Sequence, residues 1–228
     1  MAQITPTKTI YRLGFYSALI SLVATISYST VQLLQVMGIL KYPTDAILIY
    51  GFSLCIAAPY LIAIIVFHEC IDAQRKLWAN IAGAFAIMYT TFVTLMYTVQ
   101  LASVIPQSLH DPAETILAVT PHSFFWTLDA LGYICLGIST LFAAFGFPER
   151  KSYRWPRIFL IANGLMVPII GFVYFYPNFS VALLILGSPW VVTATGSFIS
   201  LAIYFRRNLH MIKKAESGAE KLSIVSLV

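Results

Sequence analysis

Long apolar runs without charged side chains alternate with short polar connections along this chain. The runs have the length of about 20 residues that an α-helix needs to cross a bilayer. They lack the strict alternation of apolar and polar positions that membrane β-strands require. The sequence therefore predicts an all-α membrane protein, a single bundle of six transmembrane helices with both termini cytosolic. The predicted spans cover residues 13–37, 46–67, 78–103, 122–147, 157–176 and 179–205.

The boundary between the last two spans needs an argument, because residues 158–205 carry no charged side chain. As one helix, this run would be roughly twice as long as the bilayer core is thick. We expect the chain to turn at Tyr176-Pro177-Asn178. A turn at Gly187-Ser188-Pro189 would leave too few residues for a span, so that motif predicts a kink inside the sixth helix.

Two segments outside the spans also carry predictions. The longest polar connection, residues 104–121, contains Asp111-Pro112-Ala113-Glu114, which has the form of a capping box with proline at the first helical position. It predicts a short interfacial helix over residues 112–119. The tail 208–228 is polar and mixed in charge, which is typical of a frayed or surface helix and not of a folded domain.

The composition excludes an ordinary soluble protein. Charged residues make up 10% and hydrophobic residues 59%, with a mean hydropathy of +0.83, whereas soluble domains have roughly 25% charged residues. The net charge of +5 comes from residues at span ends, so it does not indicate a nucleic-acid partner. The three cysteines lack C-x-x-C spacing, and we expect free thiols.

The distribution of Lys and Arg predicts the orientation. With a cytosolic amino terminus, 13 of the 14 basic residues fall on the cytosolic side and only Lys41 lies outside. The cytosolic set is Lys8, Arg12, Arg75, Lys76, Arg150, Lys151, Arg154, Arg157, Arg206, Arg207, Lys213, Lys214 and Lys221.

Asp129 is the only charged residue in the interior of a predicted span. A charged carboxylate at membrane depth costs about 2.5–3.5 kcal/mol, so it needs a partner, water or a proton. His122 and Tyr133 stand at helical spacing from it and are expected on the same face. Further polar residues expected at similar depth are Gln32, Gln35, Asp45, Tyr97 and Gln100. These residues predict a polar cavity open to the outside; alternatively, Asp129 ties helices together by hydrogen bonds.

The other candidate motif, around His68, gives weaker evidence for a site. His68 and Asp72 are four residues apart, with Glu69 beside them, but no third metal ligand is evident. The spacing of Asp72 to Arg75 and Lys76 predicts an ordinary ion pair. We therefore predict no metal site.

Small residues also mark the last two spans. Gly164, Gly187 and Gly196 can belong to interrupted helices that build a site, or can permit close helix packing. We favour close packing.

Several stretches resemble a known set of proteins. The runs KYPTDAILIYG, HECIDAQRKLWANIAGAFAIMYTTF, FFWTLDALGYICLGISTLFAAFGF and RWPRIFLIANGL, within residues 40–175, resemble an uncharacterised set of bacterial six-span membrane proteins. That set has no assigned activity. The resemblance implies the bacterial inner membrane and no site residue.

The leading functional hypothesis is the binding or transport of a small polar solute, a cation or a proton around Asp129. The alternative is a non-catalytic structural or regulatory subunit that contacts other membrane subunits. An intramembrane lipid-modifying enzyme is the third hypothesis, and the sequence shows no catalytic or cofactor motif in its support. Membrane lipid is the partner that every hypothesis shares.

The predicted topology can be tested with reporters fused to each end of the chain. Both reporters should be cytosolic, because an even number of spans returns the chain to its starting side. Reporters on opposite faces would contradict the six-span topology.

Overall fold

A computed structural model describes residues 6–110 and 117–225. In this part of the chain the secondary structure is entirely helical, without strands. Six helical units are long and apolar enough to cross a membrane: Lys8–Val36, Thr44–Cys70, Ala73–His110, Phe124–Gly146, Lys151–Phe175 and Ala182–Glu216. The prediction of an all-α bundle with six membrane-spanning helices is confirmed.

Three of the six units are composite. The elements are α1 (Lys8–Val36), α2 (Thr44–Cys70), the 3-10 turn η1 (Ala73–Arg75), α3 (Lys76–Val99), the π-helical η2 (Gln100–Val104), α4 (Ile105–His110), α5 (Phe124–Gly146), the 3-10 turn η3 (Lys151–Tyr153), α6 (Arg154–Leu165), α7 (Val167–Phe175), α8 (Val181–Gly187) and α9 (Pro189–Val225). The fifth unit is interrupted at Met166, before Pro168. The sixth is interrupted at Ser188, before Pro189, because proline lacks the amide hydrogen that continues the ladder. The chain turns between the fifth and sixth units at residues 176–180, as predicted.

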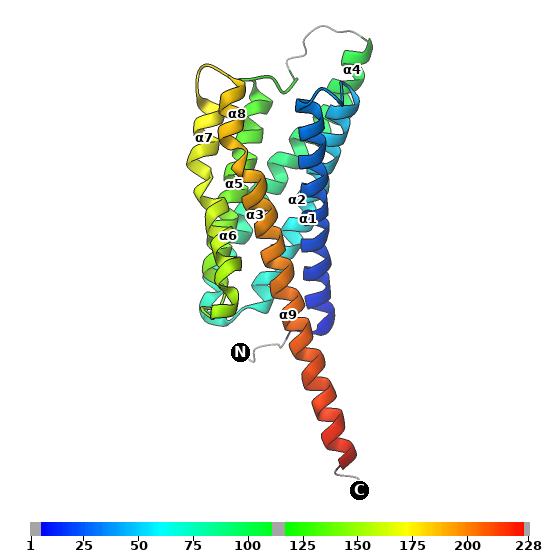
Figure 1. The fold of residues 1–228 in the computed structure, drawn as a ribbon, viewed down its shortest axis with the longest axis vertical. Coiled ribbons are helices and arrows are strands. Elements are labelled where there is room, and N and C mark those ends of the chain that lie inside the picture. The colour runs from blue at the N-terminus through cyan, green and yellow to red at the C-terminus, as the bar shows by residue number, and fades with distance from the viewer. Residues whose placement is uncertain (1–5, 111–116, 226–228) are drawn as a thin grey trace.

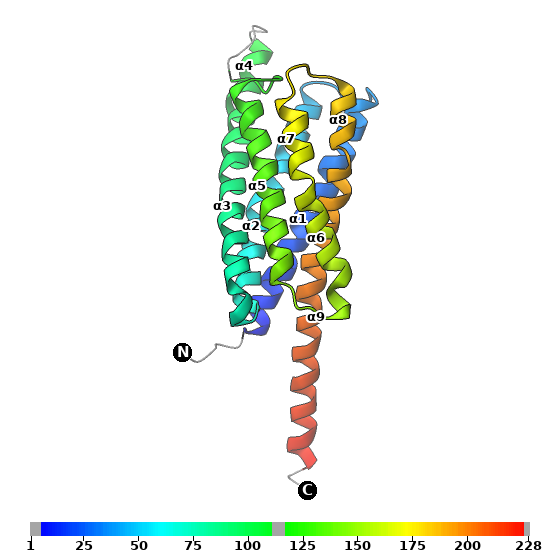
Figure 2. The same ribbon diagram turned by 90° about the vertical axis from the view of Figure 1, so that its left-hand side faces the viewer.

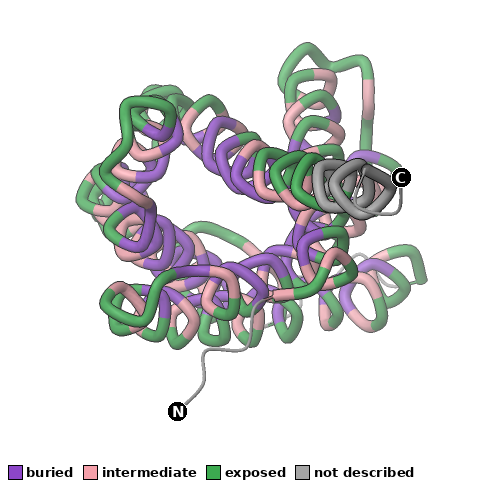
Figure 3. The backbone as a smooth tube through the Cα atoms, turned by 90° about the horizontal axis from the view of Figure 1, so that it is seen from below, coloured by how far each residue is buried: buried purple, intermediate pink, exposed green. Residues whose placement is uncertain are grey.

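The helices stand side by side and form a closed ring (Figures 1 and 2). Around the ring α1 packs on α2, α2 on α3, α3 on α5, α5 on α6 and α7, α6 on α9, and α9 on α1. Buried positions lie mainly on the helix faces that turn inward, and exposed positions mainly on the outer faces (Figure 3). We call the end with the start of α1 and the α5–α6 connection the lower end. The end with the α1–α2 turn is the upper end (Figure 1).

Of the two segments predicted outside the spans, one differs in the structure and the described part of the other is helical. Of the predicted interfacial helix 112–119, residues 112–116 lie outside the described residues, and residues 117–119 form a turn instead of a helix. The described part of the tail, residues 208–225, continues α9 without a break and extends below the bundle (Figure 1). Near the base of this extension, Glu216 pairs with Lys8 at 3.0 Å and ties α9 to the start of α1.

Neutral hydrogen bonds join the helices in the middle of the ring. The buried amide of Asn163 on α6 donates to Thr140 Oγ1 of α5 at 3.0 Å and accepts from Thr193 Oγ1 of α9 at 3.0 Å. Tyr60 of α2 donates to Ser139 Oγ at 2.7 Å, and that hydroxyl donates to the carbonyl of Ala82 at 2.7 Å. Each tie links three helices and leaves no charge in the core.

Glycines allow α5 and α6 to approach closely. A Cβ atom at Gly164 would lie 2.6 Å from Leu141 Cβ and 3.2 Å from the carbonyl oxygen of Gly137. A Cβ atom at Gly196 of α9 would likewise come too close to a neighbouring side chain, the ring of Phe159. The close-packing interpretation of these small residues is supported. By contrast, nothing stands within 4 Å of a Cβ at Gly83 on α3.

The pair Gly164 and Gly83 gives a matched test of this packing. Gly164→Ala should destabilise the protein by about 1–3 kcal/mol, because the new methyl group must displace an adjacent helix. Gly83→Ala should be neutral or stabilising by up to about 1 kcal/mol, as for alanine in an unobstructed helix. Thermal unfolding in detergent measures both variants. Equal stability of the two would show that the α5–α6 approach is not tight.

Candidate functional site

The site is built around Asp129, in the second turn of α5. Ser123 caps this helix by accepting from the amide of Trp126 at 3.2 Å, so the helix begins at Phe124 and Asp129 points into the ring, 8% exposed. Tyr97 of α3 donates to its Oδ1 at 2.9 Å, and Tyr174 of α7 donates to its Oδ2 at 2.6 Å. The carboxylate therefore joins three helices.

Asp129 has no positively charged partner within the described residues. No Lys, Arg or His side chain there lies within 4.0 Å of its oxygens. An ionised carboxylate offers about four acceptor positions, and the two tyrosines occupy two of them. The group therefore keeps acceptor capacity and, when ionised, a charge that no basic side chain of the described residues balances.

Aromatic rings surround this carboxylate. Tyr133 stands one turn after Asp129, and its hydroxyl lies 3.1 Å from that of Tyr28 on α1. The ring of Trp190, at the start of α9, lies edge-to-face with Tyr133 at 4.7 Å and with Tyr28 at 6.1 Å. We call the following set the Asp129 cluster: Asp129, Tyr28, Tyr97, Tyr133, Tyr174 and Trp190.

One polar atom of the cluster is unsatisfied. Trp190 is 7% exposed, and its buried Nε1–H has no acceptor among the described residues. Buried donors are nearly always paired with protein or water, so an unpaired indole N–H marks a place where an acceptor is missing. Tyr133 and Tyr174 are only half-buried, although their hydroxyls lie in this network. The cluster is therefore not a sealed apolar core.

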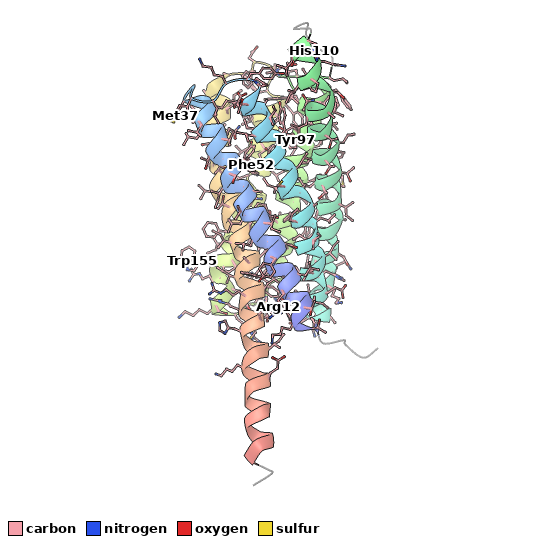
Figure 4. The ribbon with its side chains drawn as sticks, turned by 90° about the vertical axis from the view of Figure 1, so that its right-hand side faces the viewer. Arg12, Met37, Phe52, Tyr97, His110 and Trp155 are labelled. Atoms are coloured by element: carbon pink, nitrogen blue, oxygen red, sulfur yellow. The ribbon has the colours of Figure 1, made fainter. Side chains whose placement is uncertain are left out.

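The core below the cluster is closed. Tyr50 of α2 stacks on Tyr97 at 5.3 Å, and Tyr60 stands ten residues further along the same helix, about 15 Å lower. Tyr60 and Phe198 are fully buried against each other at 5.5 Å. Figure 4 places Tyr97 in the upper half of the bundle and Arg12 at the opposite end. The Asp129 cluster therefore lies in the upper half of the bundle, above a closed core.

The structure brings together only some of the predicted site residues. Tyr97 and Tyr133 lie in the Asp129 cluster, as expected. Gln32 is half-buried on α1, one turn above Tyr28. His122 was expected on the face of Asp129, and this prediction is wrong. His122 is exposed in the turn before α5, with φ at 67°, because the helix begins only after the cap.

The remaining three predicted residues make local contacts in the upper part of the bundle. The fully buried Gln100 donates to the carbonyl of Leu117 at 2.6 Å and accepts from the amide of Val119 at 3.3 Å, so it holds the connection that leads to α5. Gln35 donates to the buried Asp45 at 2.7 Å and thereby joins α1 to α2. These contacts stabilise connections and are not part of the cluster.

Sequence reasoning missed Tyr28, Tyr174 and Trp190. Tyr174 lies near the end of the fifth predicted span, and its hydroxyl donates to Asp129. A usable signal existed, since a buried carboxylate needs donors and tyrosines at matching depth on other spans can supply them. Which tyrosines face Asp129 depends on helix rotation, which the apolar pattern does not reveal.

The polar side chains around His68 contact one another in pairs. His68 contacts Glu69 at 3.0 Å, and Glu69 lies 3.9 Å from Lys76. Among residues 6–110 and 117–225, no three potential metal ligands gather. The predicted ion pair of Asp72 is absent from the described contacts, because α2 ends at Cys70 and helical spacing does not apply beyond it.

Comparison with known proteins finds no relative of this chain. No protein-family model, curated protein or solved structure matches this chain. The resemblance to bacterial six-span proteins therefore stays a prediction, and the functional argument depends on the site alone.

The hydrogen bonds to Asp129 can be tested by removing one hydroxyl. Tyr174→Phe should lower stability by about 1–3 kcal/mol, because it leaves a buried carboxylate oxygen without its donor. Tyr16→Phe is the matched control, since that ring is 59% exposed. In an Asp129→Ala background the effect of Tyr174→Phe should largely disappear, which thermal unfolding of the four variants would measure. Additive effects would contradict the coupling.

Proposed function

We propose that this protein binds a small cation at Asp129, entering from the upper end, as part of its transport across the membrane. The observation that carries this proposal is a buried carboxylate without a positive partner in the described residues, inside a ring whose lower core is closed. A bound cation would balance the charge of an ionised Asp129. Entry from the upper end, above a core that is closed below, would correspond to one state of an alternating-access transporter.

The surroundings of Asp129 favour an organic ammonium ion over a metal ion. Hard metal ions such as Ca²⁺ and Mg²⁺ take about six or more oxygen ligands. The hydroxyls of Tyr97 and Tyr174 donate to Asp129, and four tyrosine rings and one indole ring stand around it. Aromatic faces attract weakly hydrated ammonium groups, with tryptophan the most effective.

The unsatisfied Trp190 Nε1–H refines the class of solute. The indole belongs to the same cluster as Asp129 through the ring of Tyr133. A solute that carries a hydroxyl or carbonyl oxygen close to its ammonium group can supply the missing acceptor. We therefore favour small amines with one such oxygen over simple alkylammonium ions.

The proposed location is the inner membrane of a bacterium, with both termini cytosolic and the upper end outside. The basic residues of the described chain support this orientation, because all except Lys41 belong to lower-end segments or to the extension of α9. The bacterial origin is supported only by the sequence resemblance.

A second candidate, a structural or regulatory subunit of a membrane complex, has one observation in its favour. Both oxygens of Asp129 already accept a hydrogen bond from tyrosines on other helices. Such a contact can serve only to hold α3, α5 and α7 together. The two candidates differ in what Asp129→Asn does to ligand binding.

Binding of ethanolammonium, tetramethylammonium and K⁺ to the purified protein in detergent tests the proposal. Wild-type protein should bind ethanolammonium most tightly, and Asp129→Asn should weaken this binding at least about tenfold, because the neutral amide no longer balances the charge. Asp45→Asn is the matched control. Asp45 is the other buried acid on the spans, and its carboxylate is held by Gln35 outside the cluster.

Calorimetry measures binding, and thermal unfolding shows whether each variant is folded. Failure of the wild type to bind any of the three cations would reject the proposal. Unchanged binding by a folded Asp129→Asn variant would reject the role of Asp129. If Asp129→Asn loses stability while the wild type binds nothing, the structural candidate is supported.

A further inference from the structure

Positive charge is distributed unevenly over the lower end of the bundle. On the side of α1 to α3, Lys8 pairs with Glu216 at 3.0 Å and Lys76 with Glu69 at 3.9 Å. Arg75 donates to the carbonyl of Phe147. Much of the charge on this side therefore already has partners within the protein.

The side of α6 and α9 is different. Six basic residues gather there, and we call them the α6–α9 patch: Arg150, Lys151, Arg154, Arg157, Arg206 and Arg207. None of them has a carboxylate within 4.0 Å among residues 6–110 and 117–225. The acid in the same connection, Glu149, is exposed and makes no ion pair in that part of the chain. The patch therefore carries an uncompensated positive charge.

Specific contacts hold the patch together across the two helices. Arg207 of α9 donates to the carbonyl of Ser152 in η3, and its guanidinium lies 5.6 Å from the centre of the Tyr153 ring. Helix α6 packs directly on α9. Arg157 of α6 is partly buried, and its Nε–H is buried without an acceptor in the described structure.

The position of Arg154 and Arg157 at the start of α6 adds to the repulsion among the positive charges of the patch. Both stand in the first four residues of α6, at the positive end of the helix dipole, and no acidic residue or side-chain cap offsets them. Basic residues are unfavourable at this end of a helix, whereas an anion there is stabilised. Five of the six patch residues are arginine, whose planar guanidinium binds phosphate oxygens through paired hydrogen bonds.

We propose that the α6–α9 patch binds the phosphate of an anionic phospholipid. Apolar side chains next to the patch favour a lipid over free phosphate. Trp155 is 69% exposed and Ile158 is 41% exposed, on the same short stretch as Arg154 and Arg157. They can contact the acyl chains while the arginines hold the headgroup. Basic sites between helices at the cytosolic interface bind lipid headgroups of this kind. This inference does not depend on the role of Asp129.

Lipid binding to the purified full-length protein tests the site. Native mass spectrometry would compare phosphatidylglycerol with phosphatidylcholine, which carries the same phosphate but no net charge. Inorganic phosphate is the third ligand, and its binding is measured by the shift that it causes in the thermal unfolding temperature. The wild type should prefer phosphatidylglycerol at least tenfold. The triple variant Arg154→Gln/Arg157→Gln/Arg207→Gln should lose about 100-fold in affinity, since each basic residue near anionic lipid contributes about fivefold.

The matched control removes the same number of charges from the other side, as Lys8→Gln/Arg12→Gln/Lys76→Gln. It should change the affinity less than about threefold. If the triple variant does not fold, Arg154→Gln/Arg206→Gln replaces it, because both side chains are exposed. This pair should lose about 25-fold in affinity. Equal losses on the two sides, or no preference for phosphatidylglycerol, would overturn the site. Stabilisation by inorganic phosphate as strong as that by lipid would overturn the lipid as its ligand.

Discussion

The structure depends on how a single carboxylate is accommodated inside an apolar ring of helices. Asp129 accepts from Tyr97 on α3 and Tyr174 on α7, and these two bonds replace part of the hydration that the group loses in the bilayer. Because the donors come from different helices, the rotation and depth of α3, α5 and α7 are fixed relative to one another. The aromatic rings of α1 and α9 then complete the surroundings of the same group.

The two halves of the ring satisfy their polar groups differently. Around Asn163 and Ser139, neutral side chains form complete hydrogen-bonded ties between helices that approach closely at Gly164. The upper half instead combines a carboxylate and an indole N–H that find no counter-charge and no acceptor, respectively, among the described residues. Complete ties stabilise one arrangement, whereas incomplete ones leave positions that a ligand can fill. This contrast separates a structural polar group from a candidate binding group.

Charge is also divided between the ends of the molecule. The single acid of the Asp129 cluster lies beside Tyr97 in the upper half (Figure 4), whereas the α6–α9 patch lies at the lower end (Figure 1). The patch lies on the rim and the cluster lies inside the ring, so the two groups would meet different partners. An anion at the rim and a cation inside the ring would each balance a charge that the chain itself leaves open.

The sequence by itself determined the number of spans, their approximate limits and the isolation of Asp129, because membrane crossing depends on local hydrophobicity and length. It also located the interruption at Pro189, where one residue type imposes its own backbone geometry. Only the tertiary structure decided that Tyr28, Tyr174 and Trp190 surround Asp129, and that Gln100 and His122 do not. A span that is apolar on all sides carries little information about its rotation, so neighbours on other helices are set by packing between residues far apart in the chain.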